Sequence, residues 1–459
     1  MKIRNFIVLI LTGLTVGFIS CRDDFDYDFA SQNLSFSNDT INLDTLFNHT
    51  NSQTYKFTVH NHQDKDVQIP RIYLSRGESS LFKLNVDGMP GYDFENIAIR
   101  KDDSIMIFVE MAAGEAPVNP NYEDEINFET TEGTQQVKLL AYIEKALFYN
   151  TDQTDNFSLG NVNWDNEYSR VIFGKVSADN VNISQGTKIY FHNSAELTIN
   201  GNANIIGTLN QKVVFRTDRM DERSDSLPNM WGKIHLKNSN NSFIDHTIIK
   251  GGNTGLEVEN STLNISNTQI LNNEKIGLYG RNSTITGHNL VINNSDLASL
   301  AIEGGAVEFI HSTFANYHNI GQGAGSNYSL YLGNVTDDDV NIPLTQANFY
   351  NCIFYGRSGN AVILEDGGST FNYSFVNNII RLDFPNEIPS EGFSGTISED
   401  PLFVNPGFGK NDLRLLFESS AEAAGAGNYD ITTDILGHSR PANPTLGAYQ
   451  ELVNPETLD

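Results

Sequence analysis

The chain has 459 residues and a formal net charge of −28, with 57 acidic side chains against 29 basic ones. This charge excludes nucleic acid and anionic lipid surfaces as electrostatic partners of the chain as a whole. The length allows two or three domains, and a composition rich in Asn, Gly, Phe and Tyr with only 13 Pro is typical of a secreted all-β protein.

The first 20 residues have the features of an export signal. Lys2 and Arg4 precede an apolar run that begins at Phe6 and ends at Ile19, shortly before Cys21. A short apolar segment before a Cys resembles the signal of bacterial lipoproteins, in which the Cys becomes acylated. The resemblance implies a lipid anchor on Cys21 in the outer membrane. The alternative is a plain transmembrane anchor, for which the run is near the lower limit of length.

Residues 21–30 form an acidic segment without apolar periodicity, which includes Asp23, Asp24 and Asp26. The segment resembles the export signal that follows the lipidated Cys in Bacteroidota surface lipoproteins, and this implies exposure at the cell surface. An acidic linker without a targeting role would have the same composition. With Cys21 acylated, Cys352 has no disulfide partner, and its position in an expected strand predicts an inert buried thiol.

Residues 31–145 alternate between apolar and polar side chains in several short runs. Examples are 55–59, 82–86 and 104–109, separated by turn signals such as Asp87-Gly88. About seven strands in this length predict a β-sandwich. The order of features resembles immunoglobulin-like modules of the abnormal-spindle and Hydin type, which implies a spacer or docking module without chemistry. Residues 146–170 are expected to be a linker or an N-terminal cap.

The stretch 234–375 repeats itself about every 22 residues. One apolar column consists of 234–236, 256–258, 278–280, 300–302, 330–332 and 362–364. Two further columns of short apolar segments follow in each repeat. Three short strands per repeat predict the coils of a parallel β-helix.

A polar column stands before the third strand of each repeat. It consists of His246, Asn267, His288, His311, Asn351 and Asn377. Asn tolerates the left-handed backbone of a sharp corner, and stacked polar side chains can bond along the ladder of coils. The column has no Cys or carboxylate at ligand spacing, so we expect neither a metal site nor a cofactor here.

The ends of the repeat region resemble right-handed parallel β-helix proteins of the pectate-lyase-like superfamily. The motifs are Val181-Asn-Ile183, Trp231-Gly232, Asp400-Pro401 and Leu446-Gly447-Ala448-Tyr449. The resemblance implies a right-handed parallel β-helix over 171–450, followed by a tail over 451–459. The predicted fold is therefore all-β, an immunoglobulin-like β-sandwich followed by a right-handed parallel β-helix. This fold hosts lyases, hydrolases, adhesins and scaffolds, so it does not define the function.

Strand alternation predicts an outward face on the first column, because side chains between two inward ones point to solvent. The candidate binding residues are His235, Lys237, Glu257, Glu259, Tyr279, Arg281 and Tyr331. With coils about 4.8 Å apart, the first six would share a patch about 10 Å tall. A lyase acting on acidic polysaccharide needs a cation beside the carboxylate and a base for the neighbouring proton. The alternatives are a glycan-binding or protein-binding face, and a solvated face whose opposite charges pair.

The glycosidase motifs of the superfamily, Asn-Thr-Asp, Asp-Asp and Gly-His-Gly on successive coils, do not occur on an expected strand. The acidic run Asp337, Asp338 and Asp339 lies in an insertion, where it could bind Ca²⁺ or be a solvated loop. We therefore expect a binding or scaffolding β-helix, with polysaccharide as a candidate ligand, rather than an enzyme. A polysaccharide lyase or hydrolase is one alternative, and an accessory subunit of an outer-membrane protein complex is another.

Overall fold

The computed structural model describes residues 27–31, 34–149, 157–320, 327–335, 340–427 and 429–458. These residues form strands, four short 3₁₀ helices and no α-helix. The 3₁₀ helices are η1 (Gly77–Ser79), η2 (Glu222–Ser226), η3 (Pro385–Glu387) and η4 (Pro455–Thr457). None of the helices in the described part of the chain has the length and apolar character needed to cross a membrane. Cys21, the aspartates at 23, 24 and 26, and the run 337–339 lie outside the described residues.

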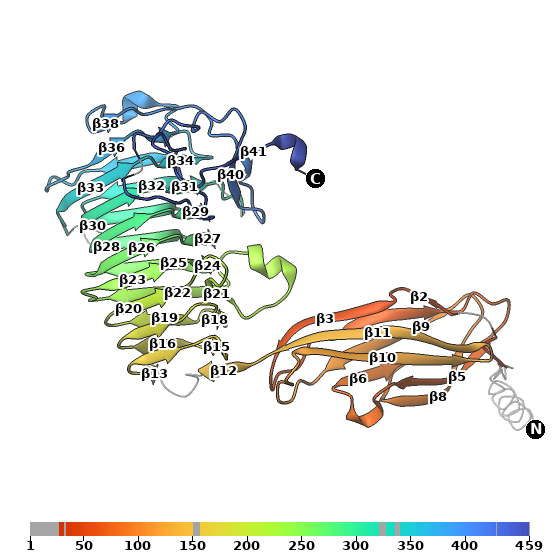
Figure 1. Cartoon of the computed structure of the whole chain (residues 1–459). Coiled ribbons are helices and arrows are strands. Elements are labelled where there is room, and N and C mark those ends of the chain that lie inside the picture. Colours follow the sequence, from red (N-terminus) through yellow and green to blue (C-terminus); the bar gives the residue numbers. More distant parts are fainter. Residues whose placement is uncertain are drawn as a thin grey trace, which may run out of the picture. The chain divides into compact units, whose positions relative to one another are not determined.

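The chain divides into two compact units, Met1–Glu144 and Lys145–Asp459. The first unit is a sandwich of two sheets (Figure 1). One sheet contains β1 (Asp28–Phe29), β5 (Val67–Leu74), β10 (Asn121–Thr130), β11 (Gly133–Glu144), β3 (Thr40–Phe47) and β8 (Asp93–Ile99), and the other contains β2 (Ser35–Phe36), β4 (Tyr55–His60), β9 (Ser104–Met111), β6 (Phe82–Val86) and β7 (Met89–Gly91). Phe36 and Phe57 of the second sheet pack on Phe128 of the first, with ring centroids 4.8 and 6.4 Å apart. The two sheets therefore share one core.

The second unit is a parallel β-helix built from two large sheets. The ten-stranded sheet contains β12 (Ala146–Tyr149), β15 (Ser169–Ile172), β18 (Lys188–Phe191), β21 (Val213–Thr217), β24 (Thr247–Lys250), β27 (Gln269–Asn273), β29 (Val291–Ser295), β31 (Thr313–Asn316), β34 (Ile353–Gly356) and β37 (Ile379–Ile380). The seventeen-stranded sheet contains β13 (Phe157–Ser158), β14 (Val162–Trp164), β16 (Lys175–Ala178), β17 (Val181–Ile183), β19 (Glu196–Ile199), β20 (Ala203–Ile206), β22 (Trp231–Lys237), β23 (Ser242–Asp245), β25 (Gly252–Glu259), β26 (Thr262–Ser266), β28 (Ile276–His288), β30 (Ala298–Ile310), β32 (Tyr328–Gly333), β33 (Leu344–Tyr350), β35 (Val362–Glu365), β36 (Ser374–Val376) and β38 (Phe393–Ser394). Each coil adds strands to both sheets (Figure 1).

The strand register confirms the repeat seen in the sequence. Leu256 pairs with Ile234 of the preceding coil and with Leu278 of the following one, and the same column continues to Leu300 and Leu330. These side chains are buried inside the coils. Their interior also holds a stack of aromatic rings from successive coils, in which Phe349 lies 5.9 Å from Phe309 and 4.7 Å from Phe375 between ring centroids. Cys352 is fully buried in the same core, as predicted, and burial raises the pKa of its thiol to about 12.

The corner column also forms, with one correction. His246, Asn267, His311, Asn351 and Asn377 all have the left-handed backbone, with φ between 45° and 54°. In the coil of β28, however, Asn289 holds this position with φ 53°, and His288 is the last residue of the strand. The sequence placed His288 at the corner because His and Asn both occur in the column and β28 continues unbroken through two columns.

The β-helix begins before residue 171. Within the range 146–170, which the sequence predicted to be a linker or cap, β12 pairs in parallel with β15, β13 with β16, and β14 with β17. The residues of this first coil are therefore part of the ladder, and Trp164 belongs to the helix core. The coil was missed because its strands have only two to four residues each and no full repeat precedes them.

The C-terminal segment folds back on the outer side of the ten-stranded sheet. Its strands β39 (Phe403–Asn405), β40 (Asp412–Leu416) and β41 (Leu452–Val453) form a small sheet. Phe403, Leu413 and Leu415 share a core with outward side chains of the ten-stranded sheet. Since β41 pairs with β40, the predicted tail over 451–459 is tied to the fold at its start.

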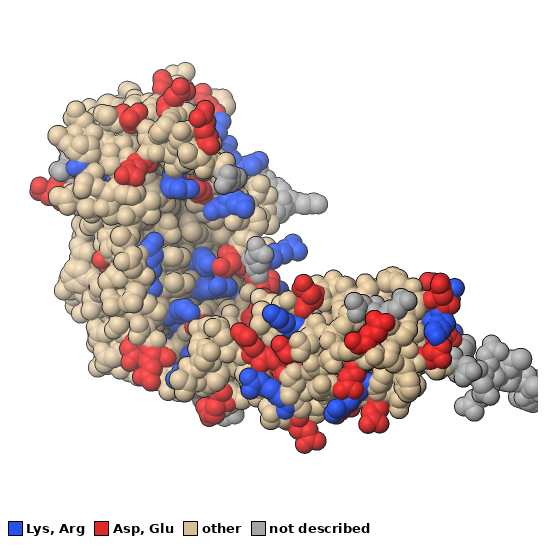
Figure 2. All heavy atoms as spheres, turned by 45° about the vertical axis from the view of Figure 1, so that its right-hand side comes forward, with Lys and Arg blue, Asp and Glu red and all other residues tan. Residues whose placement is uncertain are grey.

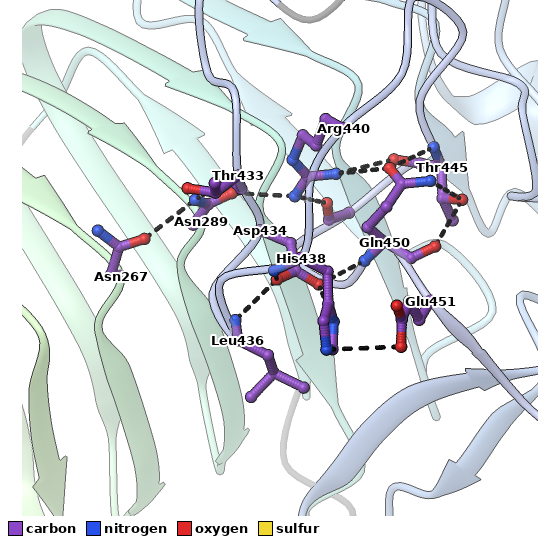
Figure 3. A network of polar contacts seen from close by, with 11 residues as sticks. Asn267, Asn289, Thr433, Asp434, Leu436, His438, Arg440, Thr445, Gln450 and Glu451 are labelled. Atoms are coloured by element: carbon purple, nitrogen blue, oxygen red, sulfur yellow. Dashed lines mark hydrogen bonds and ion pairs between the residues drawn. The ribbon is translucent and has the colours of Figure 1, made fainter. Parts of the chain in front are cut away.

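A buried polar network fixes this closing segment to the corner of the coils (Figure 3). The Asn289 amide donates to Asn267 Oδ1 at 3.0 Å and to the Thr433 carbonyl at 2.9 Å. Arg440 donates from Nη2 to Asn289 Oδ1 at 2.9 Å and to the Gly447 carbonyl at 3.0 Å. The closing segment therefore provides hydrogen-bond partners for Asn289 of the corner column.

Candidate functional site

The outward side chains of the first column lie in two parallel rows. Strand pairing aligns His235, Glu257, Tyr279, Ala301 and Tyr331 in one row, and Lys237, Glu259, Arg281 and Glu303 in the other. This is the alignment that the sequence predicted. We call the following set the ladder face: Lys233, His235, Lys237, Glu257, Glu259, Tyr279, Arg281, Glu303, Tyr331 and Glu365.

His235 is the centre of the first part of the ladder face. Its Nε2 lies 3.0 Å from Glu259 Oε2 and 3.6 Å from Glu257 Oε1. Lys233 Nζ lies 2.5 Å from Glu257 Oε2, and Lys237 Nζ lies 3.3 Å from Glu259 Oε2. The sequence predicted an exposed His235, but these four neighbours cover the ring and leave it only 7% exposed.

The surroundings of His235 determine the charges in this cluster. Burial lowers the pKa of His235, against the opposing effect of Glu257, so the imidazole is neutral at pH 7. Burial acts to raise the pKa of Glu259, but hydrogen bonds from Lys237 and His235 outweigh it, and the carboxyl pKa lies below its ordinary value. The cluster therefore holds two ammonium groups, two carboxylates and a neutral imidazole.

The same cluster brings together three side chains of metal-ligand type. One nitrogen of His235 and one oxygen each of Glu257 and Glu259 lie within 4.8 Å of one another. Imidazole and carboxylate are ligands that Zn²⁺ accepts. Lys233 and Lys237 already bind these two carboxylates, so a metal ion would have to displace both ammonium groups. The three side chains could therefore hold a metal ion only if both ion pairs with lysine were broken.

Tyr279, Arg281 and Glu303 form the second part of the ladder face. The Tyr279 hydroxyl donates to Glu303 Oε2 at 2.6 Å, and Arg281 Nε lies 3.7 Å from the same oxygen. Burial, together with the Glu303 carboxylate, raises the pKa of Tyr279 well above its ordinary range. The phenol is therefore a hydrogen-bond donor at neutral pH and a poor base.

Tyr331 forms the third part. Its hydroxyl donates to Glu365 Oε2 at 2.6 Å, and Glu365 comes from the next coil, β35. Ala301 separates Tyr331 from Tyr279 in the row, and Gly333 stands beside Tyr331 where the neighbouring coils carry charged side chains. Along its row the tyrosine has Ala301 on one side and Ile363 on the other, and its side chain is partly exposed.

The structure thus brings together the predicted residues His235, Lys237, Glu257 and Glu259, and it places Tyr279 with Arg281. It separates Tyr331 from both groups. The candidate residues named from the sequence omitted Lys233, Glu303 and Glu365, the partners that hold Glu257, Tyr279 and Tyr331 in place. Lys233 could have been found from the alternation Lys233, His235, Lys237 along one strand. The other two lie one coil beyond their tyrosines, so the direct pairing of rows does not reveal them.

Neither a protein-family model nor a curated protein matches the sequence. Among solved structures, the chain is similar to the pectate lyase Pel9A, with 12% identity over 68% of this chain and 88% of that chain and a TM-score of 0.37. It is also similar to a family 28 exopolygalacturonase from Yersinia enterocolitica, with 7% identity over 81% of this chain and 97% of that one and a TM-score of 0.14. A family 123 glycoside hydrolase from Clostridium perfringens, described for glycolipid glycan hydrolysis, matches with 9% identity over 28% of this chain and a TM-score of 0.20. The match spans only 30% of that hydrolase. At these scores the similarity carries no information about substrate or activity.

Proposed function

We propose that the β-helix binds polysaccharide through the ladder face, and that the chain presents it at the surface of a bacterial cell. The observation that carries the proposal is the ordered state of the face, where each of the five charged or hydroxyl-bearing candidate residues from Glu257 to Tyr331 already has a partner. Side chains fixed before binding lose little conformational entropy when a ligand arrives. A linear glycan presents hydroxyl groups along its length, and a row of charged acceptors and donors suits that chemistry.

The dimensions of the ladder face support the same ligand. The coils that carry His235 and Tyr331 are four steps apart, which is about 19 Å at a coil spacing of about 4.8 Å. This length accommodates several sugar units along the helix axis. Tyr279 and Tyr331 supply aromatic rings at two points of the row, and such rings pack well on the C–H faces of sugars.

For the remainder of the chain, the proposal rests on the sequence. Cys21 would carry the acyl chains, and Asp23, Asp24 and Asp26 would direct the protein to the cell surface. The first unit would be an immunoglobulin-like spacer between the anchor and the β-helix, and its two-sheet sandwich is compatible with that role. An accessory subunit of an outer-membrane complex would have the same layout, with a protein in place of the glycan.

Catalysis by a polysaccharide lyase is the second candidate, and one observation favours it. His235 is neutral at pH 7 and lies near the Lys237 ammonium, which gives a base and a cation in one cluster. Against it, the Lys237 ammonium is paired with Glu259 and the Tyr279 phenol has a raised pKa. A hydrolase would need a protonated carboxyl beside an ionised one, but Lys237 and His235 hold the pKa of Glu259 below its ordinary value, and Glu257 is paired with Lys233.

The test is a binding screen by affinity electrophoresis against neutral and uronate-bearing polysaccharides, with each polymer also assayed for new reducing ends and for ultraviolet-absorbing unsaturated uronates. We expect retardation on at least one polymer without new reducing ends. Release of unsaturated products would show that the protein is a lyase and not only a binding protein. New reducing ends without unsaturated products would indicate a hydrolase. If no polymer retards the protein and none is cleaved, the glycan proposal is wrong and a protein partner takes its place.

A further inference from the structure

A cleft of about 560 Å³ lies on the outer side of the ten-stranded sheet, away from the ladder face. Its floor is formed by Lys250 at the end of β24 and by Leu271 and Asn272 of β27. One wall is the 3₁₀ helix η2 in the long loop between β21 and β22. The other wall is the turn 409–411 between β39 and β40.

Both walls of this cleft are held by the fold. In the η2 wall, the Asp221 side chain caps the 3₁₀ helix by accepting from the Ser224 amide at 3.1 Å and from the Ser224 hydroxyl at 2.6 Å. In the other wall, Asn411 accepts from the Asn294 amide at 2.6 Å and donates to Asn272 Oδ1 at 3.0 Å, so the turn is fixed to the asparagines of two coils. The cleft is therefore a preformed feature.

The two walls also meet at one point. Gly409 has φ +78°, and a Cβ atom on it would lie 3.6 Å from the Ser226 Cβ. Glycine is favoured there because it adopts the left-handed backbone without strain. The loop and the turn therefore come close to each other beside the cleft.

The cleft is cationic although the chain as a whole is strongly acidic. Figure 2 shows Lys and Arg side chains gathered in a hollow on one face of the β-helix unit, the side that is turned forward in this view. Asp225 is the acidic residue among the described lining residues, and it is already paired with Arg216 at 2.7 Å and with Lys250 at 2.6 Å. Arg223 and Lys410 are exposed, and neither has an ion-pair partner among the side chains that the structure describes.

The lining therefore offers hydrogen-bond donors and a surplus of positive charge. Arg223 comes from the η2 wall, Lys410 from the turn 409–411, and Lys250 from the end of β24, and all three line the cleft. Leu271 adds an apolar surface to the floor, on which the C–H face of a sugar ring can pack. Guanidinium and ammonium groups arranged in this way suit a carboxylate or a sulfate, because charge-assisted hydrogen bonds to such groups are stronger than neutral ones.

We propose that this cleft binds an acidic unit of a saccharide chain, with Arg223 and Lys410 holding its carboxylate or sulfate from both sides and Lys250 contributing from the floor. The site is separate from the ladder face and does not depend on it. A nucleic acid would offer phosphates to the same cations, but its repeating charge would also meet the rest of a chain with net charge −28, so a saccharide with local acidic groups is favoured.

The test measures binding of polygalacturonate, which carries carboxylates, and of dextran sulfate, which carries sulfates, to the full chain at low and at physiological ionic strength. Uncharged dextran and a DNA duplex are the comparison ligands. The double variant Arg223→Ala with Lys410→Ala removes the two cations that have no ion-pair partner among the described side chains. The control double variant Lys175→Ala with Lys83→Ala removes the same charge from exposed positions outside the cleft lining.

We expect the cleft variant to weaken binding of at least one acidic polymer by about tenfold or more, the scale of one lost charge-assisted hydrogen bond. The control should change it by less than about twofold, the scale of a screened exposed charge. Preference for dextran sulfate over polygalacturonate identifies a sulfate, and the reverse identifies a carboxylate. Equal losses in both double variants, or no loss in either, would overturn the proposal. DNA binding that is tighter than that of both polymers and is lost in the cleft variant would overturn the saccharide assignment.

Discussion

Arg440 Nη2 donates a 2.9 Å hydrogen bond to Oδ1 of Asn289, although the two residues belong to the closing segment and to the corner of a central coil. Arg440 is 6% exposed, and burial lowers its pKa to about 10. Its other partners are the carbonyls of Thr445 and Gly447 and, at 3.5 Å, Oε1 of Gln450. The buried cation is thus held by neutral oxygen atoms, and it joins the end of the chain to the asparagine ladder (Figure 3).

Arg440→Leu should lower the free energy of unfolding of the β-helix by about 3 kcal/mol. The substitution leaves Asn289 and two buried carbonyls without a donor, and each unsatisfied group costs about 1 kcal/mol or more. Both tryptophans of the chain, Trp164 and Trp231, are buried in the β-helix, so urea unfolding followed by Trp fluorescence reports on this unit. The exposed Arg357→Leu is the matched control, with an expected change within about 0.5 kcal/mol. Equal changes in the free energy of unfolding for the two substitutions would show that the buried contacts of Arg440 do not stabilise the β-helix.

The repeat could be predicted because one physical constraint acts on every coil. Each strand must turn apolar side chains inward and polar ones outward, so Ile234, Leu256 and Leu278 fall into one column at a fixed period. Register between coils then follows without knowledge of the loops. The error at His288 arose where this constraint is weak. Strand β28 runs through two columns, and the residue with the left-handed backbone is Asn289, one position after His288.

The partners within the site could not be predicted in the same way. Alternation shows that Tyr279 faces outward, but it places Ala301 opposite it, whereas the hydroxyl reaches Glu303 in the neighbouring row. The length and rotamer of a side chain determine such contacts. The cationic cleft is still less accessible to sequence analysis, since Arg223 and Lys410 are brought together by the folding of an insertion and of the closing segment over the same sheet.

The stability of the β-helix should depend on pH through His235. Burial lowers the pKa of its imidazole below the ordinary value of 6.5, while Glu257 and Glu259 oppose this effect and Lys233 and Lys237 reinforce it. Below pH 6.5 the unfolded chain therefore takes up this proton more readily than the folded one, and the free energy of unfolding falls as the pH drops. The contribution is fully present above pH 6.5.

His235→Gln should reduce this slope between about pH 6.5 and 5, since Gln keeps a polar side chain of similar reach and does not titrate. The measurement is urea unfolding by Trp fluorescence at several pH values. His288 also has a pKa lowered by burial, so the double variant with His288→Gln should flatten the profile further. A His235→Gln profile parallel to that of the wild type would show that His235 is not buried in the neutral form.

The proposed anchor predicts that Cys21→Ala abolishes incorporation of a labelled fatty acid and releases the protein from the outer-membrane fraction, because acyl chains supply the membrane affinity. Replacement of Asp23, Asp24 and Asp26 by Ala should keep the label but lower the exposure of the protein to protease added to intact cells. Cys352→Ala is the control for the first substitution, because its thiol is buried and unavailable for acylation. Label retained by Cys21→Ala would rule out the lipoprotein assignment.

The ladder face can be tested as a binder and as an enzyme in the same experiment. Tyr331→Ala should weaken retention on the bound glycan by about 1 kcal/mol, the scale of a lost aromatic packing surface. Tyr331→Phe keeps the ring and loses only the bond to Glu365, so it separates ring packing from hydrogen bonding and should retain most of the affinity. If the chain is instead a lyase, Lys237→Ala should reduce turnover on a uronate polymer by about 10²-fold or more, since it removes a cation that shares Glu259 with His235. A glycan that binds all three variants as tightly as the wild type, and is not cleaved, would place the binding site elsewhere on the chain.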